Sequence, residues 1–184
     1  MLTLLLIDIQ VGLRETNFYG TERNNLDAEV NAAKILEFFR TKKLPVFHIQ
    51  HCSTNVESPL HPSKPGNALH PLVSPLKDEP VFQKNVNSAF IGTPLETELK
   101  SKGIEEVVIV GLTTEHCVST STRMAANLGF KVNLISDATA AFDKIGVNGQ
   151  KFSAELIHNT ALANLKDEFA IIKDTVTLLN ELQD

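Results

Sequence analysis

Apolar residues along the chain follow two patterns, short continuous runs and helical repeats, which alternate from one end to the other. Residues 2–7 form a nearly continuous apolar run that ends at Asp8, as expected for a strand buried on both faces of a parallel sheet. Later strands are predicted at residues 45–49, 81–82, 107–110, 132–135 and 169–172. Helices are predicted at residues 27–43, from residue 94, at 117–128, near 150–165 and after Asp174. This alternation predicts an α/β fold around a mainly parallel sheet.

Local signals mark where several of these helices begin and end. Thr93 can cap the helix that follows, Pro94 suits its first position, and Glu96 would complete a capping box. Gly129 is placed to end the helix before it, and Asp174 is placed to cap the last helix.

Composition places the chain among ordinary soluble proteins. Its 184 residues suit one domain over residues 1–184, with 42% hydrophobic and 21% charged residues. The net charge of -5 gives no basic surface for nucleic acid, and two cysteines make no disulfide framework. The N-terminus lacks a basic start and a small-residue cleavage site, and its apolar stretch is too short to span a bilayer. We therefore expect a cytoplasmic protein without membrane or nucleic-acid partners.

Residues 51–80 are predicted to form a long irregular loop. Six of the eight prolines of the chain lie in this segment. Loops of this length inside a compact domain are usually functional or disordered. We therefore expect this loop to contribute to substrate specificity.

Cys117 is the strongest candidate for a reactive residue. It lies between the apolar run that ends at Gly111 and the predicted helix that begins near residue 117. The N–H groups and partial positive charge of a helix N-terminus would favour the thiolate, which is the nucleophilic form. The alternative is a buried structural cysteine, since free cysteine is among the most buried residue types. Cys52 has no such helix start after it and is expected to be inert.

Asp8 and Lys84 also end or follow predicted strands. In open α/β sheets, ligands bind outside the carboxyl ends of the strands, where the strand order reverses. If the first and fourth strands are neighbours, Asp8 and Cys117 meet at that point. Taken singly, an aspartate after a strand is often a cap, and a loop lysine is usually a solvated charge.

The sequence of these segments resembles that of the isochorismatase-like cysteine hydrolases, a superfamily that includes nicotinamidases and N-carbamoylsarcosine amidases. The matching segments are Leu5-Leu6-Ile7-Asp8-Ile9-Gln10, Lys84-Asn85-Val86-Asn87-Ser88-Ala89-Phe90, Gly111-Leu112-Thr113-Thr114-Glu115-His116-Cys117-Val118 and Asp137-Ala138. The resemblance implies a three-layer α/β fold, in which a six-stranded, mostly parallel sheet of order 3-2-1-4-5-6 has helices on both faces.

The resemblance also implies a catalytic triad of Asp8, Lys84 and Cys117. Cys117 would attack a carbonyl-type carbon to give a covalent intermediate, and Asp8 would take the thiol proton and later help to activate water. Lys84 would hold Asp8 and lower the thiol pKa by its positive charge. The family carries a non-proline cis peptide that falls at Leu112-Thr113 here. This bond would aim the Thr113 amide, with that of Cys117, at a developing oxyanion.

Four of the six histidines, His48, His51, His61 and His70, lie close together in the sequence and raise the question of a metal. The Asp-x-His motif of nicotinamidases is absent, because His48-Ile49-Gln50-His51 has no carboxylate at the matching place. We therefore predict no metal, and expect these histidines to hydrogen-bond within the loop. The turn after Asp8 lacks the glycine pattern of a dinucleotide site, and no P-loop occurs, so we predict no cofactor.

The presence of Cys117 favours hydrolysis of an amide, carbamoyl or ureide-like C–N bond in a small molecule. Several true isochorismatases, which cleave a vinyl ether, lack this cysteine. Ether hydrolysis and a ligand-binding or scaffold protein without turnover remain alternatives. Substrate contacts are expected from Gln10, Phe18, Phe90, His116 and Phe142. A homo-oligomer, dimer or larger, is expected from the family habit and from the apolar side of the 51–80 loop.

Overall fold

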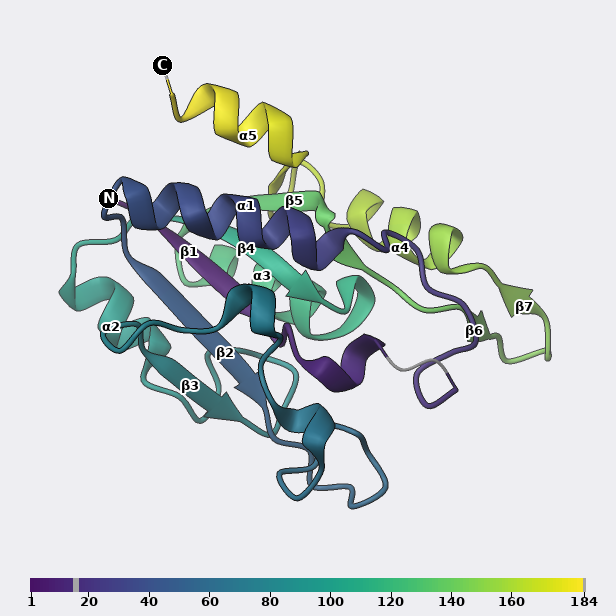
Figure 1. Cartoon of the computed structure of the whole chain (residues 1–184). Helices are drawn as coiled ribbons and strands as arrows, with labels where there is room; N and C mark the ends of the chain where they lie inside the picture. Colours follow the sequence, from purple (N-terminus) through teal and green to yellow (C-terminus); the bar gives the residue numbers. More distant parts are fainter. Residues whose placement is uncertain (15–16, 184) are drawn as a thin grey trace.

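A six-stranded parallel sheet forms the centre of the computed structural model, which describes residues 1–14 and 17–183 (Figure 1). Its strands are β1 (Leu2–Ile7), β2 (Val46–His51), β3 (Val81–Lys84), β4 (Glu106–Leu112), β5 (Lys131–Ala140) and β8 (Ile171–Lys173). They lie in the order β3-β2-β1-β4-β5-β8, and every neighbouring pair is parallel. The predicted order is confirmed, since β8 is the sixth strand of this sheet.

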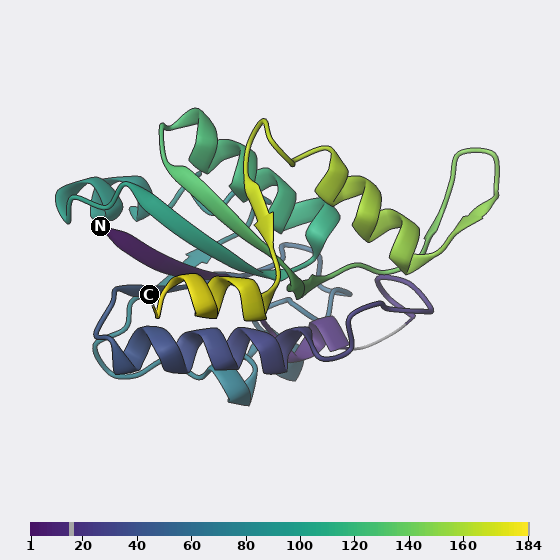
Figure 2. The same ribbon diagram turned by 90° about the horizontal axis from the view of Figure 1, so that it is seen from above.

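Helices cover both faces of the sheet, as Figure 2 shows from above. On one face lie α1 (Ala28–Thr41) and α5 (Thr175–Glu181), and on the other lie α2 (Leu95–Ser101), α3 (Ser119–Asn127) and α4 (Ala154–Ala163). Side chains of β1 alternate between the two layers, because successive residues of a strand point to opposite faces. Leu4 and Leu6 pack in the α1 layer, whereas Leu5 and Ile7 pack in the other.

Shorter elements follow the carboxyl ends of the strands. They are the 3₁₀ turns η1 (Val11–Arg14), η2 (Pro65–Asn67) and η3 (Pro71–Val73), and the π-helical turn η4 (Thr114–Val118). An antiparallel pair that the sequence pattern did not predict, β6 (Lys144–Ile145) with β7 (Lys151–Phe152), projects beyond the sheet (Figure 1). Among the described helices, none combines the length and apolar character needed to cross a membrane.

The predicted helix ends are only partly right. The Asp174 side chain accepts a hydrogen bond from the Thr177 amide, and Gly129 ends its helix with a φ of +91°. At α2, however, the N-cap is Pro94, without a capping bond from a side chain. The Thr93 hydroxyl donates to the Ala89 carbonyl at 2.5 Å, which leaves only a long contact of 3.4 Å to the Leu95 amide.

Candidate active site

The three predicted reactive residues meet at the carboxyl edge of the sheet. Asp8 directly follows β1, Lys84 is the last residue of β3, and Cys117 lies in η4 just after β4. Strand β1 is adjacent to β4, which brings Asp8 beside Cys117, whereas β2 separates β1 from β3. The Lys84 side chain passes the end of β2, where it contacts His51, and reaches Asp8. The close approach of β4 to β1 requires glycine at position 111, where a Cβ atom would lie 2.0 Å from the Ile7 carbonyl oxygen.

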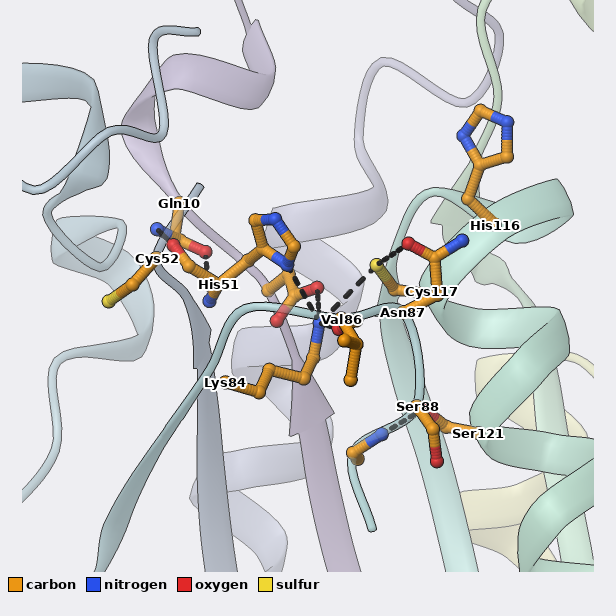
Figure 3. Close-up of polar contacts among 12 residues, drawn as sticks. Gln10, His51, Cys52, Lys84, Val86, Asn87, Ser88, His116, Cys117 and Ser121 are labelled. Carbon is orange, nitrogen blue, oxygen red and sulfur yellow. Dashed lines mark hydrogen bonds and ion pairs between the residues drawn. The ribbon is translucent and has the colours of Figure 1, made fainter. Parts of the chain in front are cut away.

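The Lys84 ammonium lies at the centre of this cluster (Figure 3). Its Nζ is 2.6 Å from Asp8 Oδ2, 3.1 Å from the Val86 carbonyl oxygen and 3.2 Å from His51 Nδ1. The Cys117 sulfur is the fourth neighbour, at 3.3 Å. The side chains of Lys84 and Asp8 are almost completely buried, so water screens this ion pair very little.

The two oxygens of the Asp8 carboxylate differ in their hydrogen bonding. Oδ2 accepts from Lys84, whereas Oδ1 is buried and has no hydrogen-bond partner among the residues that the structure describes. A carboxylate oxygen that is buried without a partner lowers the stability of the fold, and such oxygens often have a functional role. Since Asp8 and Cys117 both line one pocket, this oxygen is available to accept a proton.

The surroundings of Cys117 favour its protonated thiol over the thiolate. Burial raises its pKa well above the usual value, and the Asp8 carboxylate raises it further, while the Lys84 ammonium opposes both effects. The Lys84 charge lowers the thiol pKa, as predicted, but burial and the Asp8 carboxylate outweigh it, so the predicted net preference for the thiolate is not found. Cys117 lies inside the π-helical turn η4, and regular α-helix begins only at Ser119.

The turn from β4 to η4 exposes backbone to the same pocket. The peptide bond between Leu112 and Thr113 is cis. The Thr113 carbonyl accepts hydrogen bonds from the amides of His116, at 3.1 Å, and Val118, at 3.3 Å, and so closes the turn. Thr113 and Cys117 therefore both line the pocket, on the side that β4 provides.

The pocket has a volume of about 180 Å³. Asp8 and Cys117 lie in its wall together with apolar side chains, amides and hydroxyls, and its lining is Asp8, Leu13, Phe18, Tyr19, His51, Ser53, Asn55, Ser58, Leu60, Asn87, Leu112, Thr113, His116 and Cys117. Among the described residues of this lining, Asp8 is the only carboxylate, and none is a lysine or an arginine. The Asp8 carboxylate is paired with the Lys84 ammonium, so the described part of the lining carries little net charge.

Two of the five predicted substrate-binding residues, Phe18 and His116, line this pocket. Gln10, Phe90 and Phe142 are not part of its lining. Phe90 packs against Phe130 in the core, and Phe142 is fully buried behind the wall, against Tyr19. Periodicity marks an aromatic residue as apolar, but it does not distinguish the core from a pocket wall.

Gln10 is buried and holds the neighbouring strand rather than the pocket. Its side-chain amide donates to the His51 carbonyl at 3.0 Å, and its oxygen accepts from the His51 amide at 2.8 Å. The sequence pattern also missed pocket residues that do face the cavity. They are Leu13, Tyr19, His51, Ser53, Asn55, Ser58, Leu60, Asn87 and Leu112. A signal existed for Asn87, which lies inside the Lys84–Phe90 motif, and for the five residues from the predicted specificity loop.

The four clustered histidines do not converge on one site. His48 pairs with Glu79 at 3.0 Å, His61 contacts Ser63, and His70 contacts Arg14. Of the four, only His51 belongs to a group with metal-ligand geometry, in which one atom each of Asp8, His51 and Cys117 lies within 4.8 Å of the others. The Lys84 ammonium contacts all three residues. A cationic group of the protein therefore fills the centre of this group, and the residues do not fit a bound metal.

Comparison with known proteins identifies the relatives of this fold and site. Residues 3–176 match the isochorismatase domain. The chain is 48% identical to the isochorismatase family protein YrdC of Bacillus subtilis (strain 168), over 97% of this chain and 94% of that protein. The chain belongs to the isochorismatase family.

The chain is also similar to a solved structure and to a relative that is named as a nicotinamidase. The crystal structure of an isochorismatase-family protein from Chromobacterium violaceum superposes with a TM-score of 0.93, at 39% identity, and covers 98% of this chain and 93% of that one. Nicotinamidase 3 of Arabidopsis thaliana is 36% identical over 102 residues, which are 55% of this chain and 46% of that protein. Membership therefore makes this protein an isochorismatase-like hydrolase with amidase relatives.

Proposed function

We propose that this isochorismatase-family protein is a cysteine hydrolase that cleaves the C–N bond of a small uncharged amide, carbamoyl or ureide-like molecule. The observation that carries the proposal is the Asp8 carboxylate near the Cys117 sulfur, with a buried Oδ1 that has no hydrogen-bond partner among the described residues. A raised thiol pKa would be a handicap for a cysteine that acted as a free thiolate. It suits a thiol that loses its proton to a base only as it attacks.

The mechanism begins with transfer of the Cys117 proton to Asp8 while the sulfur attacks the carbonyl carbon. The resulting tetrahedral intermediate collapses when its C–N bond breaks, and Asp8 returns the proton to the departing nitrogen. A thioester to Cys117 remains. Water then gives a proton to Asp8 and its hydroxide to the acyl carbon, and the acid product leaves as the thiol is restored.

Lys84 holds the two partners of this proton transfer together. Its bond to Asp8 Oδ2 fixes the carboxylate, so that Oδ1 is free to face the thiol. Its 3.3 Å contact with Cys117 Sγ stabilises the sulfur as negative charge develops there. The amides of Thr113 and Cys117 are the proposed donors to the oxyanion, since both residues lie on the β4 side of the pocket.

The charge of the pocket favours amide hydrolysis over the family's ether hydrolysis. Isochorismate is a dicarboxylate, and carboxylates are normally bound by arginine or lysine. The described lining offers neither, and its single carboxylate is already paired with Lys84. The nicotinamidase relative, whose name gives an uncharged amide as its substrate, supports the same direction.

A panel of uncharged amides and ureides, read by ammonia release, tests the proposal. We expect turnover by the wild-type protein, and trapping of the thioester by hydroxylamine as a hydroxamate. Cys117→Ala should abolish both signals, and Cys52→Ala should keep both. Turnover that survives Cys117→Ala would favour the ether-type mechanism, which needs only Asp8 and Lys84. Absence of turnover across the panel would favour a ligand-binding protein.

A further inference from the structure

The β6–β7 hairpin has no role in the mechanism described above, but its base contacts a segment that lines the pocket (Figure 1). This segment, residues 17–23, is called the strap here, and it supplies Phe18 and Tyr19 to the pocket wall. It begins with a tight turn, in which the Asn17 amide donates to the Gly20 carbonyl at 2.6 Å. The two rings lie 4.9 Å apart in this turn, edge to face. The residues that hold the strap therefore also position two aromatic rings in the pocket.

Asp143, the residue before β6, binds the strap through its carboxylate and its backbone. Its Oδ1 accepts from the amides of Thr21, at 2.6 Å, and Glu22, at 2.7 Å, and its Oδ2 accepts from the Thr21 hydroxyl at 2.8 Å. The Asp143 amide donates to the Glu22 carbonyl at 3.0 Å. The Asp143 side chain is only 5% exposed, so water and salt weaken these charge-assisted bonds very little.

The contact between the strap and Asp143 requires glycine at position 20. A Cβ atom there would lie 2.6 Å from Asp143 Oδ1 and 2.7 Å from the Cβ atom of Phe142. Phe142 is fully buried, and its ring centre is 5.8 Å from that of Tyr19. The strap backbone therefore lies directly on the chain that leads into β6, without room for a side chain between them.

Lys144, the first residue of β6, joins the strap to the turn that carries the nucleophile. Its Nζ donates to the Tyr19 carbonyl at 3.0 Å and lies 3.3 Å from Glu115 Oε1. Glu115 belongs to η4, two residues before Cys117, and both of its carboxylate oxygens are buried. The base of the hairpin thus contacts the strap and η4 at the same time.

We propose that Asp143 and Lys144 are positioning residues, together a clamp, which hold the strap as a wall of the pocket and so limit the size of the acyl group that reaches Cys117. The inference rests on the proposed amidase function and goes beyond it, since it assigns a role to the hairpin. The pocket has a volume of only about 180 Å³, so a shift of two aromatic rings alters much of its lining. Loss of the clamp should weaken the binding of small substrates without removing any group that reacts.

Two variants open the contact, and a third is the matched control. Asp143→Ala removes the carboxylate, and Gly20→Ala forces the strap away from Asp143 while every side chain of the wall remains. Lys151→Met is the control, because Lys151 also contacts Asp143, at 3.2 Å, but is 45% exposed, and exposed ion pairs contribute little. On a substrate from the amide panel, we expect the first two variants to raise KM about tenfold or more, with kcat within about threefold of wild type. The control should match the wild type in both constants.

A second readout does not depend on amide turnover. The chain has two cysteines, so a Cys52→Ala background leaves Cys117 as the single thiol for alkylation by iodoacetamide or by fluorescein iodoacetamide. The two reagents share one reacting group, so the thiol pKa cancels from the ratio of their rates. We expect Asp143→Ala and Gly20→Ala to raise the ratio of the bulky to the small reagent about tenfold or more, and Lys151→Met to leave it unchanged.

Lys144 is tested together with its carboxylate partner. Lys144→Met alone would leave the Glu115 carboxylate buried beside no closer cation, which destabilises a fold. The double variant Lys144→Met with Glu115→Gln removes both charges, and we expect it to stay folded. It should raise KM and the alkylation ratio in the same direction as Asp143→Ala.

The alkylation ratio decides on the clamp whatever the amide panel gives. A wild-type ratio in Asp143→Ala and Gly20→Ala, in proteins that circular dichroism shows to be folded, would overturn the inference. An equal rise in Lys151→Met would also overturn it, because exposed charge rather than the buried contacts would then hold the strap. If the wild type hydrolyses no amide, the proposed function fails, and the ratio still supports or overturns the clamp.

Discussion

Cys52 and Cys117 are both half-buried, and both follow a strand at the same edge of the sheet, but their surroundings differ. The Cys117 sulfur lies 3.3 Å from the Lys84 ammonium and shares a pocket with Asp8. The contact found for the Cys52 sulfur is the neutral amide of Asn67, at 3.9 Å. Cys52 borders a separate hollow, and its side chain points away from Lys84 and Cys117 in Figure 3.

The difference follows from the alternation of side chains along a strand. His51 and Cys52 are consecutive at the end of β2, so their side chains point to opposite sides. His51 faces the pocket, which turns Cys52 away from it. A position at a strand end therefore does not by itself bring a cysteine near charged groups, and the side chains of neighbouring strands supply them.

Replacement of each cysteine gives the largest expected contrast. We expect Cys117→Ala to abolish amide hydrolysis while the protein remains folded, because the nucleophile is lost. Cys52→Ala should keep near wild-type kcat, since its sulfur contacts no reacting group. Kinetics on a substrate found in the panel, with circular dichroism as the check on folding, measures both. Similar losses in the two variants would contradict the comparison.

Replacement of Asp8 or Lys84 should lower kcat almost as much as replacement of Cys117. We expect Asp8→Asn and Lys84→Met each to lower kcat by about 100-fold or more, the usual scale for acid–base groups. The double variant should be no worse than the poorer single one, because the two residues serve one proton transfer. Multiplied losses would show that Asp8 and Lys84 act in separate steps.

The pKa of the Cys117 thiol offers a sharper test, with a predicted sign. The Asp8 carboxylate disfavours the thiolate and raises this pKa, so Asp8→Asn should lower it. The thiolate would then form at lower pH in an enzyme that has lost most of its activity. Lys84→Met should shift the pKa the other way. Ultraviolet titration of the thiolate, in a Cys52→Ala background, measures these shifts. An unchanged pKa in Asp8→Asn would exclude contact between the two charges.

Chelation should have no effect on the Cys117 site. The Lys84 ammonium contacts Asp8, His51 and Cys117, which are the residues that could otherwise bind a metal. We expect full activity after treatment with EDTA and its removal by gel filtration, relative to a sample filtered without EDTA. Loss of activity that zinc or iron restores would show that a metal displaces Lys84 during catalysis.

The loop after Cys52 exposes apolar side chains, which bears on assembly of the protein rather than on catalysis. Val56, Leu72 and Leu76 are each at least half exposed there. We expect a second copy of the chain to cover apolar surface of this kind and to give a dimer or larger assembly. Light scattering at micromolar concentration should give a multiple of the 20.2 kDa chain mass. A mass near 20 kDa would contradict this expectation.

Much of the fold, and the convergence of Asp8, Lys84 and Cys117, could be predicted from the sequence. Each buried strand is a short apolar run, and Asp8 and Cys117 follow such runs, because parallel strands bury both faces and end at the ligand-binding edge. The segment around Cys117 also carries the resemblance to the family. These features are local in the chain, so a linear pattern is enough to reveal them.

Only the tertiary structure decided which residues surround the thiol and in which protonation state they act. His51, Tyr19 and Asn87 reach the pocket from separate segments, and Phe90 and Phe142 turn into the core. The sign of the shift in the pKa of Cys117 depends on burial and on its distances to Asp8 and Lys84, not on its position before a helix. Electrostatic effects depend on separation in space and on local dielectric, and the folded arrangement of β1, β3 and β4 sets both.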